Sequence, residues 1–129
     1  MLGSFQQSQL RIEIAAPIQK IRDGLVCSEQ LRQWLAPQHL EADMPDELGS
    51  GLVFKSTIGP LVIQHQVEIL ESNYMRLILS QGIDGYHEWY WGEGWLQSRL
   101  EGISLLPLNL GQTLSLLRFK NFLAHKPSS

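Results

Sequence analysis

Residues 108–125, which read LNLGQTLSLLRFKNFLAH, decide the fold because they form a helix with a broad apolar face. Asn109 is a favourable N-cap residue, and Gln112 three positions later completes a variant of the capping box. About sixteen helical residues make a helix of about 24 Å. Its apolar positions are Leu110, Leu114, Leu116, Leu117, Phe119, Phe122 and Leu123. A face this wide needs a large apolar partner, and the strand-rich chain before it is the only candidate.

The chain before this helix alternates apolar and polar residues in short segments, which is the pattern of half-buried strands. Turn residues separate most of these segments, so consecutive strands form hairpins in an antiparallel sheet. Two short helices, whose apolar faces include Ile21 and Trp34, follow the first strand. The predicted strands are residues 10–14, 40–44, 52–56, 61–70, 74–80, 86–91 and 95–104. The fold class is therefore α+β, with a curved seven-stranded antiparallel sheet wrapped around the long C-terminal helix.

One hairpin holds most of the aromatic residues, and its register decides which side chains share a face. A three-residue loop at positions 92–94 ends on a glycine and places Trp91 opposite Trp95. A two-residue loop places Glu88 opposite Arg99 and exchanges the faces. We predict the three-residue loop, and the two-residue loop remains the alternative that the sequence allows. In the predicted register one face reads His87, Trp89, Trp91, Trp95, Gln97 and Arg99.

Composition narrows the class of protein. The 129 residues are predicted to form one domain, 1–129, in which residues 127–129 and the first few residues are disordered. The net charge of −3 and the lack of a basic cluster disfavour nucleic-acid binding. The single cysteine, Cys27, fits a reducing compartment. No signal peptide or membrane segment is apparent, so we expect a cytoplasmic protein.

The order of these elements resembles the helix-grip superfamily, which includes START domains, proteins of the birch-pollen-allergen type and polyketide cyclase-like proteins. Ala16-Pro17 after the first strand, the Leu31-x-x-Trp34 helix and the stretch WGEGWLQSRLEGISLLPLNLGQTLSLLRFKNFL at 91–123 carry the resemblance. It implies a cavity between the sheet and the last helix, filled by sterols, lipids, hormones or polyketides. The family has no universal catalytic motif, so the resemblance assigns no catalytic residue.

The candidate ligand-binding residues come from the aromatic hairpin, the second short helix and the long helix. They are Trp34, His65, Trp89, Trp91, Trp95, Arg99, Leu114 and Leu117. His65 interrupts an apolar strand. It is either a polar anchor in the cavity or a core histidine whose hydrogen bonds are satisfied by a neighbour. Arg99 either holds a ligand carboxylate or, on the convex side of the sheet, faces solvent or pairs with a glutamate, and the second interpretation is favoured. Leu117 is predicted to be buried.

These observations favour a non-catalytic binder of a hydrophobic small molecule, such as a lipid, a polyketide or an isoprenoid-like compound. The first alternative is a cyclase or dehydratase that uses His65, Glu88 or Arg99. The second is a protein-interaction module of the chaperone-activator or ribosome-associated type, for which a homodimer is one form. No cofactor or catalytic residue is predicted. The alternation of His39, Glu41 and Asp43 has no recognised metal-ligand spacing, so no metal is predicted either.

Overall fold

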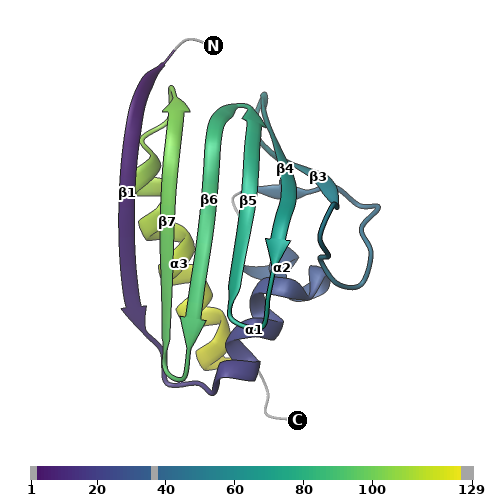
Figure 1. Ribbon diagram of the computed structural model, residues 1–129, viewed down its shortest axis with the longest axis vertical. Helices are drawn as coiled ribbons and strands as arrows, with labels where there is room; N and C mark the ends of the chain where they lie inside the picture. The colour runs from purple at the N-terminus through teal and green to yellow at the C-terminus, as the bar shows by residue number, and fades with distance from the viewer. Residues whose placement is uncertain (1–2, 36–37, 126–129) are drawn as a thin grey trace.

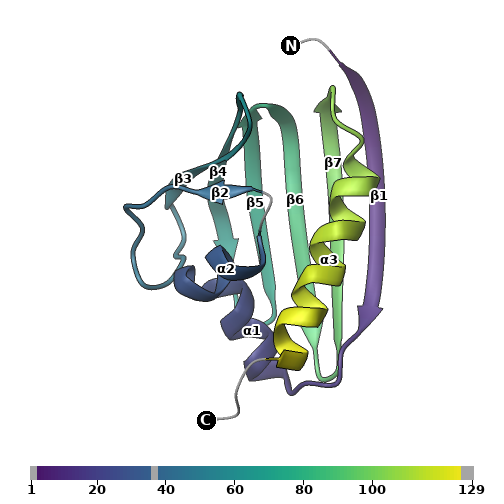
Figure 2. The same cartoon turned by 180° about the vertical axis from the view of Figure 1, so that it is seen from behind.

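The computed structural model describes residues 3–35 and 38–125, which form one curved antiparallel sheet with all the helices on the same side (Figures 1 and 2). The sheet order is β1-β7-β6-β5-β4-β3-β2. The strands are β1 Ser4–Glu13, β2 His39–Leu40, β3 Val53–Ile58, β4 Leu61–Leu70, β5 Tyr74–Gln81, β6 Ile83–Gly92 and β7 Trp95–Ser104. The helices are α1 Ile18–Val26, α2 Ser28–Trp34 and α3 Leu108–His125. The predicted α+β architecture is confirmed.

Helix α3 lies across β1 and β7, and its C-terminal half meets α1 and α2 (Figure 2). Its buried residues are Leu108, Gln112, Leu116, Phe119 and Leu123. Leu110, Leu114 and Leu117 are instead 55%, 44% and 55% exposed. Successive residues of a helix are rotated by about 100° about its axis. These three leucines therefore form a stripe on the side of α3 opposite to its buried residues. The prediction that Leu117 is buried was therefore wrong.

The first strand begins six residues before the prediction. Strand β1 runs from Ser4, and the side chains of Gln6 and Ser8 in its first half bond to the start of α3. The Gln6 side chain accepts a hydrogen bond from the Leu108 backbone N–H at 2.9 Å and donates one to the Leu106 carbonyl at 2.9 Å. The Gln6 side chain therefore satisfies the Leu108 backbone N–H at the beginning of α3. The predicted capping box was wrong, because α3 already begins at Leu108 and the side chains of Asn109 and Gln112 bond to Ser8 and Ser98 instead.

The β6–β7 hairpin turns through two residues, Glu93 and Gly94. Gly94 has φ 76°, a left-handed conformation that glycine adopts without strain. Gly92 lies opposite Trp95, and Glu88 lies opposite Arg99. The predicted three-residue loop was wrong and the alternative register is correct. A register shift of one residue moves the side chains of a strand to the other face of the sheet. The residues predicted to share one face of the hairpin therefore lie on two different faces.

Two other strands differ from the predictions by at least three residues at one end. Strand β2 has two residues, His39–Leu40, where five were predicted, and β6 begins at Ile83 instead of residue 86. Gly85 lies in β6 opposite Gly102 of β7, and a Cβ on Gly85 would lie 1.9 Å from the Glu101 carbonyl oxygen. The two glycines thus allow the strands to approach closely here. The tail predicted to be disordered, 127–129, lies outside the described residues.

Candidate functional site

A cavity of about 130 Å³ lies between the concave face of the sheet and the first half of α3. Strands β3 to β7, helices α1 and α2, and the segment that leads into α3 also contribute to its wall. The apolar lining includes Leu25, Leu31, Trp34, Phe54, Ile63, Met75, Leu77, Leu79, Ile83, Trp89 and Leu100. The polar side chains of the described lining are Gln38, His65, His87, Gln112 and Ser115. No Asp, Glu, Lys or Arg belongs to this described lining, so its ionisable groups are the two histidines.

Trp34 joins the short helices to both the sheet and α3. Its indole N–H donates to the Gly24 carbonyl at 2.7 Å, and its ring meets Trp89 and Phe119 edge-on at centroid distances of 6.1 and 4.9 Å. A Cβ on Gly24 would lie 2.6 Å from a ring carbon of Phe119. The small residue at position 24 therefore lets α1 approach α3 closely. These contacts hold Trp34 in one orientation in the cavity wall.

Two histidines on the concave face are each bonded to a serine of the neighbouring strand. His65 Nε2 lies 2.9 Å from the Ser56 hydroxyl, and His87 Nε2 lies 2.7 Å from the Ser98 hydroxyl. His65 also stacks on Phe54 at a centroid distance of 4.7 Å. Burial lowers the pKa of His65 from 6.5 to about 4. Burial, and to a lesser extent the neighbouring His65, lowers the pKa of His87 to about 3. Both rings are therefore neutral at pH 7.

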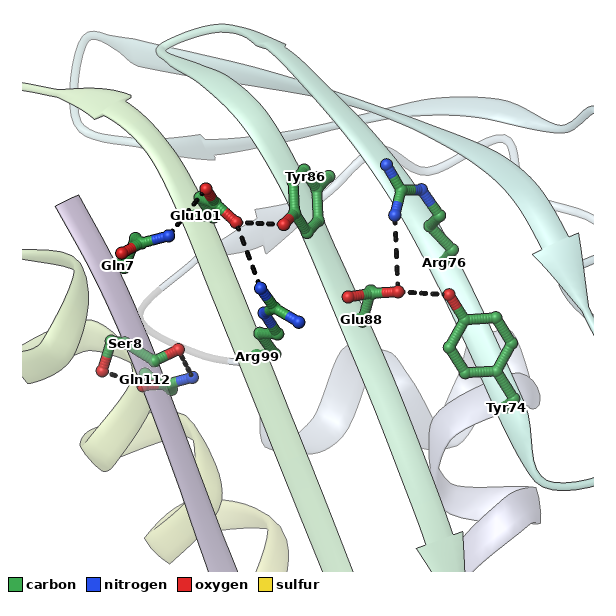
Figure 3. A network of polar contacts seen from close by, with 9 residues as sticks. All are labelled: Gln7, Ser8, Tyr74, Arg76, Tyr86, Glu88, Arg99, Glu101 and Gln112. Carbon is green, nitrogen blue, oxygen red and sulfur yellow. Dashed lines mark hydrogen bonds and ion pairs between the residues drawn. The ribbon is translucent and has the colours of Figure 1, made fainter. Parts of the chain in front are cut away.

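Gln112 brings a polar group from α3 to the same region. Its amide nitrogen lies 2.9 Å from the Ser98 carbonyl, 3.0 Å from the Ser98 hydroxyl and 3.2 Å from the Ser8 carbonyl. Its amide oxygen accepts a hydrogen bond from the Ser8 hydroxyl at 2.5 Å. Figure 3 shows this link between β1 and α3. Gln112 is buried, and its bonds satisfy it at the contact of α3 with β1 and β7.

The convex face carries a separate polar network that does not reach the cavity. Figure 3 shows Glu88 on β6 accepting hydrogen bonds from the Tyr74 hydroxyl and from Arg76 on β5. The carboxylate of Glu101 likewise accepts from the Tyr86 hydroxyl, and it lies 3.7 Å from the Arg99 guanidinium (Figure 3). The favoured interpretation of Arg99, a glutamate-paired arginine on the convex side, is therefore the one that the structure shows. The proposed role of Arg99 as a cavity anchor was wrong.

The eight candidate residues occupy three different places. Trp34, His65 and Trp89 line the cavity. Trp91 is fully buried in the core, outside the lining. Trp95 and Arg99 face outward because of the two-residue turn, and Trp95 stacks beneath Arg11. Leu114 and Leu117 lie on the solvent side of α3.

Among the polar lining residues that the sequence prediction missed, His87 and Gln112 are both bonded to Ser98. His87 was assigned to the correct strand, but its predicted neighbours on that face, Gln97 and Arg99, are on the opposite side. Gln112 was interpreted as part of a helix cap. A polar residue within the buried stripe of α3, at the spacing of Leu108 and Leu116, was the signal that would have found it.

The described residues offer few other kinds of site. No group of three His, Cys, Asp or Glu side chains that could hold a metal ion occurs among them. Cys27 is a free thiol, half-buried between α1 and α2. None of the helices within 3–35 and 38–125 is long and apolar enough to cross a membrane.

Comparisons with known proteins identify the architecture. No family model matches the sequence, and no curated protein matches it. Solved structures do match. The Aha1 dimer from Colwellia psychrerythraea superposes with a TM-score of 0.66 at 16% identity, over 92% of this chain and 96% of that one. Ara h 8.0201, of the Bet v 1 family, gives 0.65 at 14% identity, over 95% and 96%. This is a helix-grip fold.

A third helix-grip structure is DynU16, described as a protein of the dynemicin biosynthetic locus. It matches with a TM-score of 0.70 at 16% identity over 92% of this chain, which spans 47% of the length of DynU16. The resemblance to the helix-grip superfamily is thus confirmed at the level of the fold. At these identities the matches show the fold alone, so the function is argued from the cavity.

Proposed function

We propose that this helix-grip chain binds an apolar small molecule in the cavity between the sheet and α3. The observation that carries the proposal is a cavity of about 130 Å³ whose described lining is mostly aliphatic and aromatic and has no charged side chain at pH 7. Cavities of this kind favour apolar guests, because a guest replaces contacts that the lining otherwise lacks. The Bet v 1-like and polyketide-locus neighbours support a fold suited to hydrophobic ligands.

The size of the cavity favours a small ligand. A dry, apolar protein cavity of about 150 Å³ is large enough for benzene, whereas drug-sized ligands occupy roughly 300–1,000 Å³. A volume near 130 Å³ therefore suits a molecule with one ring, or a single isoprenoid unit. Within the classes expected from the sequence, we propose the smallest members and exclude whole sterols or long acyl chains from this cavity.

The chemistry of the lining favours binding over catalysis. Of the three groups considered for an enzyme, Glu88 and Arg99 lie on the convex face, and His65 lines the cavity. An efficient acid–base catalyst at neutral pH has a pKa near 7. The pKa values of His65 and His87, about 4 and about 3, make both rings weak bases. Binding therefore remains the function with the best support.

Adding benzene is expected to raise the melting temperature of the purified protein, since a ligand that binds only the folded state stabilises it. At a ligand concentration of 100 times Kd, the gain is about 2.7 kcal/mol. Differential scanning calorimetry measures the shift. Replacing Leu79 by phenylalanine fills part of the cavity and is expected to weaken binding, whereas Leu114→Phe makes the same change on the exposed side of α3 and leaves binding intact.

Two results would remove the proposal. One is the absence of any benzene-induced shift in the natural sequence. The other is an equal shift in the Leu79→Phe and Leu114→Phe variants, because binding would then occur away from the cavity. Native mass spectrometry after gentle purification would show whether a molecule is already bound.

We propose self-association through α3 as a second function, because the solvent side of this helix carries an apolar stripe. Leu110, Leu114 and Leu117 are each 44–55% exposed and lie along one side. Burying large apolar side chains contributes roughly 1.5–3 kcal/mol each. One structural neighbour is described as a dimer, the Aha1 protein from Colwellia psychrerythraea. The proposed occupant of the stripe is a second copy of this chain.

Sedimentation equilibrium of the full chain is expected to show a concentration-dependent dimer. Changing Leu114 and Leu117 to lysine together should give a monomer, because charges cannot be buried in the apolar contact without a large cost. Changing Phe5, which is 61% exposed at the start of β1, to lysine is the matched control and should leave the dimer intact. A natural sequence that remains monomeric at high concentration would contradict this second proposal.

A further inference from the structure

The direction of each hydrogen bond around Gln112 can be assigned. The backbone carbonyls of Ser8 and Ser98 can only accept, so the side-chain atom near both must be the amide nitrogen of Gln112. The amide oxygen then accepts from the Ser8 hydroxyl, whose own oxygen accepts from Asn109 at 2.7 Å. Donors and acceptors in this part of the network are thus assigned without conflict.

The same reasoning extends to His87. The Ser98 hydroxyl oxygen lies 3.0 Å from the amide nitrogen of Gln112, which can only donate. Ser98 cannot donate to that nitrogen, so its hydrogen is paired only if it goes to its other partner, His87 Nε2, at 2.7 Å. A neutral imidazole that accepts at Nε2 carries its proton on Nδ1. Among the described residues, no acceptor for this Nδ1–H is found, although His87 lines the cavity.

His65 repeats the arrangement on β4. The only partner of the Ser56 hydroxyl within the described chain is His65 Nε2, at 2.9 Å. If the serine donates, its hydrogen is satisfied and the imidazole proton lies on Nδ1. The opposite direction leaves two buried groups unpaired instead of one, the serine hydrogen and the Nδ1 lone pair. The Nδ1 atom of His65 is buried and, within residues 3–35 and 38–125, has no partner.

We propose that the cavity selects ligands with an uncharged acceptor oxygen, such as a ketone, and that His87 Nδ1–H donates the hydrogen bond that holds it. The proposal rests on the proposed function, because it assigns the polar end of the same ligand. His65 belongs to the same lining, and its buried Nδ1 has no partner among the described residues.

An uncharged acceptor oxygen fits this lining better than an ion. A buried carboxylate needs a positive partner, and the described lining has no lysine or arginine. An alcohol brings a hydroxyl hydrogen as well, and the unpartnered acceptor of the described lining is Gln38 Oε1. A ketone brings only an acceptor, which is what a free N–H requires. The ligand class is therefore a small apolar ring that bears an uncharged acceptor oxygen, such as a ketone.

Two ring compounds of nearly equal shape test the proposal. Cyclohexanone has an acceptor oxygen, and methylenecyclohexane has a carbon in its place. The quantity to measure is the ratio of their dissociation constants, by calorimetry, in the natural sequence and in variants. Because the two compounds differ in solubility, the change in this ratio is informative and its absolute value is not. Replacing His87 by phenylalanine should shift the ratio about tenfold against cyclohexanone, the worth of one hydrogen bond.

His39→Phe is the matched control, because His39 is exposed on β2, outside the lining. It should leave the ratio unchanged. A nitrogen-15 NMR spectrum of the natural protein gives a second measurement that requires no substitution. It reports which ring nitrogen carries the proton, and Nδ1 is expected for both His65 and His87.

The outcomes separate this inference from the proposed function. If both compounds bind and His87→Phe leaves their ratio unchanged, the ligand class is wrong while the binding function stands. A His87 protonated on Nε2 would likewise overturn the inference alone. If neither compound binds to the natural protein, the inference and the proposed function both fail.

Discussion

Replacing Phe119 by alanine is expected to lower the free energy of unfolding by about 3–5 kcal/mol, the usual cost of truncating a fully buried phenylalanine. Phe119 is 0% exposed and sits where α3 meets the short helices. Its ring touches Trp34 at a centroid distance of 4.9 Å and fills the space above Gly24. The substitution therefore removes the contact that three helices share. Equilibrium denaturation in urea measures the loss.

Leu117→Ala is the matched control on the same helix. Leu117 is 55% exposed, so at protein concentrations low enough to keep the chain monomeric its truncation should cost less than about 1 kcal/mol. The two leucine stripes of α3 make this comparison sensitive to the orientation of the helix. Equal losses from both substitutions would contradict the assignment of Phe119 to the core and Leu117 to solvent.

The second large effect is a loss of stability in mild acid. His65 has a pKa of about 4 in the folded protein and His87 has one of about 3, against 6.5 for an unperturbed histidine. Between these values the unfolded chain binds protons that the folded chain does not. Stability is therefore full above about pH 6.5 and falls as the pH is lowered. The slope approaches about 1.4 kcal/mol per pH unit for each histidine.

The window from pH 6.5 to 4.5 isolates these histidines. The pKa of Glu101 is lowered, chiefly by the Tyr86 hydroxyl, so the stability it contributes is lost only at more acidic pH. Urea denaturation at pH 6.5 and 4.5 should differ by a few kcal/mol in the natural protein. Replacing both His65 and His87 by leucine should remove most of this difference, and replacing exposed His39 should not. A stability that is flat across the window would show that both histidines are accessible to protons in the folded state.

Much of the architecture could be predicted because local patterns determine it. The order of strands and helices follows from alternation, turn residues and helical spacing, and all ten elements occur in the predicted order. The first half of β1 escaped prediction because its inward positions are polar. Gln6 and Ser8 are suited to that place only because α3 offers them partners about a hundred residues later in the chain.

The site could be predicted only in part, because it depends on register and orientation. Trp34, His65 and Trp89 were placed on the correct elements, and they line the cavity. A turn of two residues instead of three sends Trp95 and Arg99 outward. Local sequence favoured neither turn strongly, and the burial of Leu96 against the core decides between them.

The orientation of α3 was ambiguous for a similar reason. Leucines occupy both sides of the helix, so helical spacing alone fits the exposed stripe as well as the buried one. The buried side of α3 is the one that carries Gln112, because the amide of Gln112 donates to carbonyls of β1 and β7. This reason becomes visible only once the positions of both strands are known. Hydrogen-bond partners that lie far away in the sequence carry information that periodicity does not contain.

The pairing of β1 with β7 also constrains how the chain is made in the cell. Strand β1 is synthesised first, yet its one neighbour in the sheet is the last strand, and the hydrogen bond from Gln6 to Leu106 spans 100 residues. A nascent chain that has not yet reached β7 leaves β1 with unpaired backbone groups. The domain therefore closes only after nearly all of it has left the ribosome, and contacts of such long range make this closure slow.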